Sequence, residues 1–208
     1  MLLGAWVKPP ENPRWILDVG AGSGLLSLMM AQRWPQAVVN AVEIDKAAHE
    51  ECLQNFSNSP WQQRLQSHHL DFTRWNCQYE FDLIISNPPY FSEQFFSPDS
   101  QRMMARSEGS LNLISLIEIS AGLLKPNGVI ALVSKSSRLD EIKFLAEVKR
   151  FRLNVTLVSG REGKEPALCL AMMGPTVSDS LDSLVIKDRN GNYTEDYVNL
   201  TKDFYINF

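Results

Sequence analysis

The sequence predicts an α/β fold built on a mostly parallel, twisted β-sheet with helices on both faces. Short apolar runs that suit buried strands alternate along the chain with segments whose apolar residues have helical spacing. Such alternation is typical of a parallel sheet covered on both faces. A glycine-rich turn at 20–24 separates the first apolar run from the first helical segment. The 208 residues suit one such domain, since a chain of this length buries roughly two-thirds or more of its unfolded surface.

The first half of the chain predicts a strand, helix and strand, followed by a further helix and strand. Trp15 to Val19 is an apolar run with a single acid, and Leu25 to Met29 begins a helical pattern directly after the glycines. The other elements expected in this half are strands over 38–42 and 65–69 and a helix over 47–58, which stops before Ser59-Pro60.

The second half continues the same alternation. Phe81 to Ser86 has the strongest strand pattern of the chain. A helix is predicted over 111–124, and the run Lys125-Pro126-Asn127-Gly128 is expected to end it. The remaining predicted elements are a helix over 138–148 and strands over 129–133, 155–158 and 167–173.

Two segments do not fit the alternation. The segment 91–109 is polar and aromatic and follows a strand end, where open α/β sheets bind ligands, so its length indicates a functional loop. The segment 176–208 ends in several aromatic residues. We expect it to form an appended strand and helix that pack on the main domain, which spans residues 1–175.

Composition limits the location and the cofactors of the protein. No apolar run approaches the roughly 18 residues of a membrane-spanning helix, and the N-terminus lacks a signal-peptide pattern, so we expect a cytoplasmic protein with no membrane partner. Cys52, Cys77 and Cys169 are odd in number and widely spaced, which fits neither a disulfide framework nor a metal site. The sequence does not fix the oligomeric state, and we take a monomer as the working expectation.

The charge balance limits how the chain can bind a polyanion. Its net charge of -4 counts against nonspecific attraction to phosphates, which requires clustered lysines and arginines. A local basic patch is still compatible with this balance, although each candidate could equally be a solvated surface charge. The candidates are Arg102, Arg106, Lys135, Arg138, Lys149, Arg150, Arg152, Arg161 and Lys164.

The glycine turn predicts a ligand site at the start of a helix. Gly20, Gly22 and Gly24 follow Asp18 at a strand-to-helix junction, where the backbone must bend tightly and a ligand must approach without a Cβ in the way. The amides of the helix N-terminus then face an anion. That anion could be the pyrophosphate of a dinucleotide or the carboxylate of S-adenosylmethionine, with Asp18 near the ammonium group of the latter.

Two further acids are candidates for contacts to an adenosine. Glu43 lies 25 positions after Asp18, at the end of the second strand, where a carboxylate can accept both ribose hydroxyls. Both cofactor classes require such an acid. Asp71 follows the third strand and could accept the exocyclic amine of the adenine, or it could simply cap a helix.

The tetrapeptide Asn87-Pro88-Pro89-Tyr90 indicates the chemistry. It directly follows a strand, and its prolines fix their own φ angles and hold the preceding residue in an extended conformation. The side chain of Asn87 and the carbonyl of Pro88 can therefore accept both hydrogens of an NH2 group. Such bonds orient a nitrogen lone pair that is otherwise delocalised, and Tyr90 could stack on a planar substrate. The alternative is a rigid structural turn with Tyr90 in the core.

Together the glycine turn, Glu43, Asp71 and Asn87 to Tyr90 resemble the Rossmann-like class I amino-methyltransferases. More narrowly, the chain resembles the bacterial enzymes that methylate N6 of adenine 37 in valine tRNA. The segments that carry this narrower resemblance are 2–6, 16–26, 58–61, 81–90, Arg102 with Ala105-Arg106, Tyr193-Thr194, Leu200-Thr201 and Phe204-Tyr205. Relative to that family the segment before Leu2 is short, and a basic residue usual in the last core strand is missing near Ala167-Leu168.

The resemblance implies S-adenosylmethionine as cofactor and tRNA as partner, with no metal. It places Asp18, Gly20, Gly22, Gly24, Glu43, Asp71 and Asn87 at the cofactor, and Asn87, Pro88, Pro89 and Tyr90 at the reacting amine. Tyr90, Arg102, Arg106 and Arg138 would contact the RNA. Three alternatives stay open at this point. One is methylation of a glutamine amide in release factors, whose enzymes share the tetrapeptide. The second is methylation of guanine N2 in ribosomal RNA, whose enzymes tend to have Phe where Tyr90 stands, and the third is a noncatalytic RNA-binding module that retains the fold.

Overall fold

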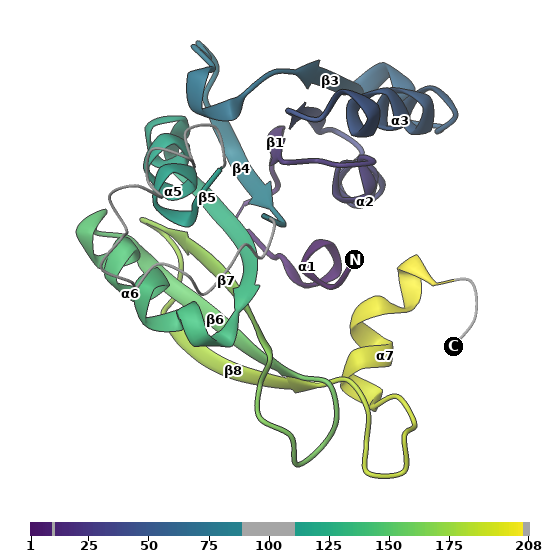
Figure 1. Ribbon diagram of the computed structural model, residues 1–208, viewed down its shortest axis with the longest axis vertical. Coiled ribbons are helices and arrows are strands. Elements are labelled where there is room, and N and C mark those ends of the chain that lie inside the picture. The colour runs from purple at the N-terminus through teal and green to yellow at the C-terminus, as the bar shows by residue number, and fades with distance from the viewer. Residues whose placement is uncertain (10, 89–110, 206–208) are drawn as a thin grey trace, which may run out of the picture.

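The computed structural model describes residues 1–9, 11–88 and 111–205, and it contains one eight-stranded sheet (Figure 1). The strand order is β3-β2-β1-β4-β5-β7-β6-β8. β7 runs antiparallel to β5 and β6, and every other neighbouring pair is parallel. The strands are β1 (Trp15–Val19), β2 (Val38–Glu43), β3 (Leu65–His69), β4 (Phe81–Ser86), β5 (Leu124–Lys135), β6 (Arg152–Ser159), β7 (Leu168–Gly174) and β8 (Ser180–Val185). The prediction of a mostly parallel sheet is confirmed.

Helices cover both faces of this sheet. α5 and α6 lie on one face, whereas α1, α2 and α3 lie on the other, with α7 beside α1 (Figure 1). The helices are α1 (Leu2–Trp6), α2 (Leu25–Arg33), α3 (Lys46–Ser57), α5 (Leu113–Gly122), α6 (Leu139–Val148) and α7 (Glu195–Thr201), with short 3-10 turns at 62–64, 72–74, 136–138 and 202–204. Among the described residues, no helix is both long enough and apolar enough to cross a membrane.

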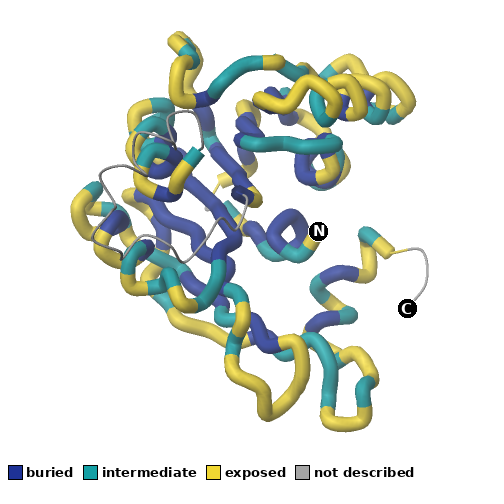
Figure 2. The backbone as a smooth tube through the Cα atoms, viewed as in Figure 1, coloured by how far each residue is buried: buried dark blue, intermediate teal, exposed yellow. Residues whose placement is uncertain are grey.

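The core forms two layers because successive strand residues point to opposite faces. Ile16 and Ile85 pack on the side of α1, α2 and α3, whereas Leu17 and Ile84 pack on the side of α5 and α6. All four side chains are fully buried. Figure 2 shows the central strands as an almost continuous buried stretch, as a sheet covered on both faces requires.

The start of β5 differs from the sequence expectation. The segment 125–128 was predicted to form a turn after a helix, but it lies inside β5. Phe81 pairs with Leu124 and Leu83 pairs with Val129, so the extra residues of β5 bulge out of the ladder. A Cβ on Gly128 would stand 2.6 Å from the carbonyl oxygen of Phe81, and the glycine therefore permits this close approach.

The two ends of the chain also add elements to the domain. The segment 176–208 contributes the predicted strand and helix, β8 and α7, and β8 joins the main sheet beside β6. The helix α1 was not predicted. It is fixed by tertiary hydrogen bonds, because the indole of Trp6 donates to Thr156 Oγ1 at 2.9 Å and the carbonyl oxygen of Gly4 accepts from Arg33 at 2.6 Å.

Candidate functional site

The predicted cofactor and amine residues lie at the carboxyl ends of four neighbouring strands, β3, β2, β1 and β4. Val19 pairs with Val42 of β2 on one side and with Ser86 of β4 on the other. The chain leaves β1 toward β2, and β4 lies on the opposite side of β1, so the strand order reverses between β1 and β4. Open α/β sheets bind their ligands in the crevice at such a reversal.

The glycine turn leaves open space beside its backbone. Gly20 and Gly22 have φ angles of +70° and +56°, and a Cβ on either residue would meet nothing within 4 Å. The amides of Gly20 and Ala21 both donate to the carbonyl oxygen of Val42, at 2.9 and 3.1 Å, which anchors the turn to β2. A ligand can therefore lie directly against the turn.

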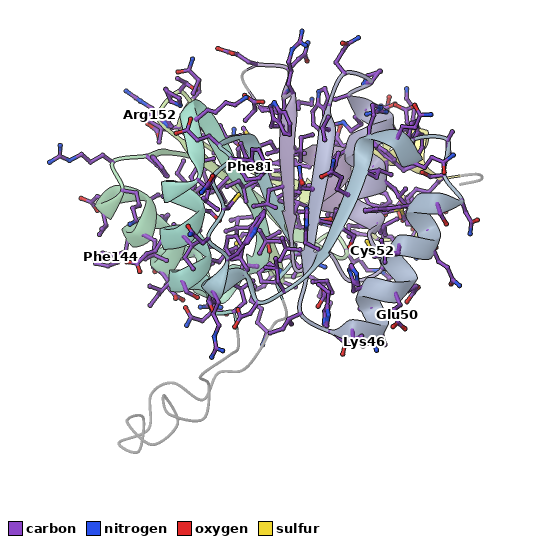
Figure 3. The ribbon with its side chains drawn as sticks, turned by 90° about the horizontal axis from the view of Figure 1, so that it is seen from above. Lys46, Glu50, Cys52, Phe81, Phe144 and Arg152 are labelled. Atoms are coloured by element: carbon purple, nitrogen blue, oxygen red, sulfur yellow. The ribbon has the colours of Figure 1, made fainter. Side chains whose placement is uncertain are left out.

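Gly24 is required for packing rather than for access. Its φ is +83°, and a Cβ there would lie 2.7 Å from both Cys52 Sγ and a ring carbon of Phe56. Cys52 faces the core from α3, whereas Lys46 and Glu50 of the same helix are exposed (Figure 3). The side-chain amide of Asn55, also from α3, donates to the carbonyl oxygen of Ser23 at 2.9 Å. These contacts hold the start of α2 against α3.

Glu43 links the end of β2 to the glycine turn. Its Oε2 accepts a hydrogen bond from the amide of Gly22 at 2.7 Å, and its Oε1 accepts from the amide of Asp45 at 2.8 Å. The side chain is 8% exposed, so it is nearly buried but borders the surface. Each carboxylate oxygen retains a lone pair, and Glu43 can therefore still accept the hydroxyls of a ribose.

Asp18 is fully buried at the end of β1. Its Oδ2 accepts hydrogen bonds from the amide and the hydroxyl of Ser27, at 3.0 and 2.7 Å. Its Oδ1 is buried and has no hydrogen-bond partner among the residues that the structure describes. Burial raises the pKa of Asp18 to about 6, the bonds from Ser27 oppose that rise, and the charge of Glu43 adds to it. Ser27 was not among the predicted site residues, because its contact depends on how α2 docks against β1.

Asp71 has the capping role that was the alternative expectation. Its Oδ1 accepts from the amide and the hydroxyl of Thr73, at 2.9 and 2.7 Å, at the start of the 3-10 turn 72–74. Its Oδ2 lies 3.5 Å from Nε of Arg74. An adenine amine would have to share this carboxylate with those groups, so a contact between Asp71 and the cofactor stays a prediction.

The start of the tetrapeptide lies beside the glycine turn. The hydroxyl of Ser86 donates to the carbonyl oxygen of Val19 at 2.7 Å, so the ends of β4 and β1 are joined one residue before Asn87 and Gly20 respectively. The side chain of Asn87 is exposed, and Pro88 is buried. Pro89, Tyr90 and the segment 91–109 lie outside the described residues.

The basic candidates lie at both edges of the sheet. Arg138 lies just after β5, at the same edge of the sheet as the glycine turn. Its guanidinium forms a two-bond ion pair with Glu141, both bonds at 2.8 Å. Arg161 and Lys164 are exposed in the connection 160–167, which follows the end of β6 at the same edge. Arg152 begins β6 and lies at the opposite edge from Lys46, as Figure 3 shows. Arg102 and Arg106 lie outside the described residues.

Metal chemistry has no candidate ligands in the part of the chain that the structure describes. No group of three or more His, Cys, Asp or Glu side chains there could hold an ion. The buried thiols are also poor ligands and nucleophiles, because burial raises the pKa of Cys52 and that of Cys169 to about 11.

Comparisons with known proteins agree with this arrangement. A family model described as a methyltransferase small domain matches residues 2–153. The tRNA1(Val) (adenine(37)-N6)-methyltransferase of Flavobacterium johnsoniae is 38% identical over 213 residues, which cover 99% of this chain and 90% of that protein. The chain belongs to the tRNA1(Val) (adenine(37)-N6)-methyltransferase family. Another tRNA1(Val) (adenine(37)-N6)-methyltransferase, from Shewanella loihica, is 37% identical over 220 residues, covering 99% of this chain and 90% of that protein.

Solved structures place the fold of this tRNA methyltransferase family member among the Rossmann-like methyltransferases. A predicted O-methyltransferase from Agrobacterium tumefaciens aligns with a TM-score of 0.74 at 20% identity, covering 97% of this chain and 94% of the other. A putative RNA methyltransferase from Pyrococcus horikoshii aligns with a TM-score of 0.55 at 16% identity, covering 82% and 76%. At such identities the likeness concerns the fold alone.

Proposed function

We propose that this chain methylates N6 of adenine 37 in valine tRNA1, with S-adenosylmethionine as the methyl donor. Family membership supports the reaction, since the relatives are tRNA1(Val) (adenine(37)-N6)-methyltransferases. The observation that supports the site is the bond between Ser86 and Val19, which brings Asn87 and the glycine turn to adjacent strand ends. A methyl donor held at the turn and an amine held by Asn87 would be neighbours in the same crevice.

The residues at the turn fit S-adenosylmethionine. The open space beside Gly20 and Gly22 leaves room for the cofactor against the backbone. Glu43 has the lone pairs to accept the two ribose hydroxyls, and Asp18, two residues before Gly20, would attract the ammonium group through its charge. When bound, S-adenosylmethionine would supply a methyl group bonded to a sulfonium sulfur, and S-adenosylhomocysteine is the leaving group when the methyl group is transferred.

Asn87 and Pro88 have the task of orienting the substrate amine. The exocyclic nitrogen of adenine is a weak nucleophile because its lone pair is shared with the ring. Hydrogen bonds from its two hydrogens to the Asn87 side-chain oxygen and the Pro88 carbonyl would aim the lone pair at the methyl group. The proline ring of Pro89 would restrict the backbone after this carbonyl, and Tyr90 would stack on the extruded base.

Arg138 lies at the edge where the RNA must approach, and its charge is shared with Glu141. The exposed Arg161 and Lys164 lie at the same edge and have no carboxylate within ion-pair distance among the described residues. We therefore include these two residues in the RNA-binding surface, together with Arg138 and the sequence candidates Arg102 and Arg106.

The reaction is tested with labelled S-adenosylmethionine and total tRNA from cells that lack the modification, followed by nucleoside analysis. We expect label in N6-methyladenosine from valine tRNA1, and none in a transcript of that tRNA with guanosine at position 37. Label in a release-factor peptide but not in tRNA would replace the proposal with glutamine methylation.

The cofactor assignment is tested separately by calorimetry with S-adenosylhomocysteine and NAD. We expect S-adenosylhomocysteine to bind and NAD to bind far more weakly. Glu43→Gln should weaken binding of S-adenosylhomocysteine at least about tenfold, since an amide cannot accept both hydroxyls while bonded to two backbone amides. Glu50→Gln, on the exposed side of α3, is the matched control and should bind as the parent does.

A further inference from the structure

One peptide unit connects the end of β3 to the carboxylate of Glu43. The peptide between Ile44 and Asp45 is planar, so the directions of its carbonyl and its N–H are fixed relative to each other. The carbonyl oxygen of Ile44 accepts a hydrogen bond from Nε2 of His69 at 3.0 Å. The N–H of Asp45 donates to Oε1 of Glu43 at 2.8 Å. The bond from His69 therefore sets the direction in which this N–H points at Glu43.

The donor in the first of these bonds is the imidazole of His69. A carbonyl oxygen has no proton to give, so Nε2 must carry the hydrogen. Hydrogen bonds in a chain polarise one another, and donation to the Ile44 carbonyl therefore makes the N–H of Asp45 a stronger donor to Glu43. His69 acts on the carboxylate both by position and by polarisation.

The imidazole of His69 is held in place from two elements. In the ladder of β2 and β3, His69 is the partner of Glu43. Its ring stacks on the ring of His49 from α3, with the centroids 5.4 Å apart and the planes 22° from parallel. His49 is itself tied to β3, because its Nδ1 lies 2.8 Å from Oγ of Ser67. The donor therefore has a fixed position at the Ile44 carbonyl.

The orientation of Glu43 depends on both of its amide partners. Oε2 accepts from the amide of Gly22, a residue with open space beside its backbone, and Oε1 accepts from the amide of Asp45. With one amide on each oxygen, the plane of the carboxylate is fixed, and so are the directions of its remaining lone pairs. If the amide of Asp45 turned away, the carboxylate could rotate about its remaining bond to Gly22.

We propose that His69 is a positioning residue for the cofactor, which acts through the peptide of Ile44 and Asp45 to orient Glu43 toward the ribose hydroxyls of S-adenosylmethionine. This inference rests on the proposed function, which places the ribose at Glu43. His69 itself does not contact the ribose in this arrangement. The end of β3 thereby has a part in cofactor binding that does not depend on Asp71.

The alternative is that His69 only supports the start of α3. Asp45 caps that helix, since its Oδ1 accepts from the amide of Ala48 at 2.8 Å, and His49 lies in the first turn. In that case a substitution at His69 would change stability, and cofactor affinity would not depend on whether a donor reaches the Ile44 carbonyl.

The test uses three substitutions that differ in reach and in donor. The amide nitrogen of Gln can take the place of Nε2, that of Asn takes the place of Nδ1, and Phe keeps a ring against His49 without a donor. In calorimetry with S-adenosylhomocysteine, His69→Asn and His69→Phe should weaken binding about three- to tenfold, the effect of one lost hydrogen bond. His69→Gln should bind within twofold of the parent.

The matched control is His68→Asn, one residue earlier on β3. Successive strand residues point to opposite faces, and Nε2 of His68 lies 3.0 Å from Oδ1 of Asn40 rather than at the Ile44 carbonyl. This variant should bind S-adenosylhomocysteine within twofold of the parent. Weakening equal to that of His69→Asn would show that any change on β3 disturbs the site, and would overturn the specific role of His69.

A double-mutant cycle tests whether His69 acts through Glu43. In Glu43→Ala no carboxylate remains to be oriented, so adding His69→Asn should weaken binding less than twofold further. An equal effect in both backgrounds would show that His69 does not act through Glu43. Denaturant titrations establish that each variant is folded, and if His69→Asn does not fold, His69→Phe, which keeps the ring contact, provides the same comparison.

Contrary results separate this proposal from the proposed function. Parental affinity in His69→Asn and His69→Phe, or an equal loss in His69→Gln, would overturn the role of His69 and leave the cofactor assignment intact. A parent that does not bind S-adenosylhomocysteine would overturn the cofactor assignment itself.

Discussion

The hydroxyl of Ser86 and the carbonyl oxygen of Val19 are joined by a 2.7 Å hydrogen bond between the ends of β4 and β1. Both residues are fully buried, so water does not compete for this bond. Gly20 follows one of them and Asn87 follows the other. The spacing between the proposed cofactor turn and the proposed amine acceptor is therefore fixed by the core of the sheet, not by a surface loop.

Ser86→Ala should lower kcat by up to about 100-fold while leaving the affinity for S-adenosylhomocysteine unchanged. The variant keeps the glycine turn, but the position of Asn87 relative to that turn becomes less fixed. Misplacement of a reacting group by about 1 Å can lower the rate about 100-fold. The stability loss should be about 1 kcal/mol, the contribution of one hydrogen bond. Ser57→Ala removes a hydroxyl that bonds only to Gln54 on the exposed surface. Equal kcat values for the two variants would contradict the prediction.

Gly22→Ala and Gly24→Ala should separate access from packing. Both impose a positive φ on alanine, which costs about 1–2 kcal/mol. Gly24→Ala also forces a methyl group against Cys52 and Phe56, so its total loss of unfolding free energy should be larger by about 1–3 kcal/mol in denaturant titrations. Gly22→Ala has no such clash, yet it should weaken the binding of S-adenosylhomocysteine more than tenfold. Binding at the parental affinity would mean that the cofactor does not lie against this turn.

Asp18 should make the stability of the ligand-free protein depend on pH. Its pKa is about 6 in the folded state, above its ordinary value of 3.8, so the folded state binds the proton more tightly. This contribution is fully present below about pH 4 and is lost as pH rises through 6, with a total of at most about 3 kcal/mol. The measurement is the unfolding free energy of parent and Asp18→Asn between pH 4 and 8. A difference between them that does not fall with rising pH would contradict the prediction.

Arg161→Glu with Lys164→Glu should weaken tRNA binding without affecting the cofactor. The connection that carries them is tied to the segment after β8, because the amide of Glu162 donates to the carbonyl oxygen of Lys187 at 2.8 Å and Arg189 pairs with Glu162 at 3.0 Å. The connection that carries the two variant charges is therefore held in place at the same edge of the sheet as the glycine turn. The dependence of log affinity on log salt should flatten by about one for each lost phosphate contact.

The control for this RNA prediction is Arg150→Glu, which changes the net charge by the same amount per residue at the opposite edge of the sheet. It should bind tRNA nearly as the parent does. If Arg150→Glu flattens the salt dependence and the pair at 161 and 164 does not, the RNA approaches the other edge and the proposed surface is wrong.

Sequence patterns predicted the elements whose structure depends on local residues. The strand Phe81 to Ser86 was predicted with the bounds that β4 has in the structure, because its apolar run is buried on both faces. The bulged start of β5 was missed because Pro126 and Gly128 are typical of turns, and only the approach of Gly128 to Phe81 shows why glycine is there. The five-residue α1 was missed because it is too short to be stable alone and depends on bonds to distant residues.

The strand-end positions of the candidate site residues were predictable for the same physical reason. Gly20 and Asn87 each directly follow a strand and Glu43 ends one, and strand ends can be located from sequence. The contact of Ser27 with Asp18 depends on helix docking, so no spacing rule revealed it. For Asp71 both roles were open, and the hydrogen bonds to Thr73 show the capping role.

Asn87→Ala should reduce kcat at least about 100-fold and leave the affinity for S-adenosylhomocysteine within twofold of the parent. The variant removes one of two acceptors that orient the amine, and the loss of a single positioned hydrogen-bonding group typically has an effect of this size. Its side chain is exposed just after β4, whereas the predicted ribose contact lies on Glu43 at the end of β2, so cofactor binding should be independent. Single-turnover kinetics with saturating tRNA isolates the chemical step. Asn58→Ala, at the exposed end of α3, is the matched control and should react at the parental rate. If Asn87→Ala also reacts at that rate, Asn87 does not orient the amine, and the rigid turn that begins at Pro88 has a structural role only.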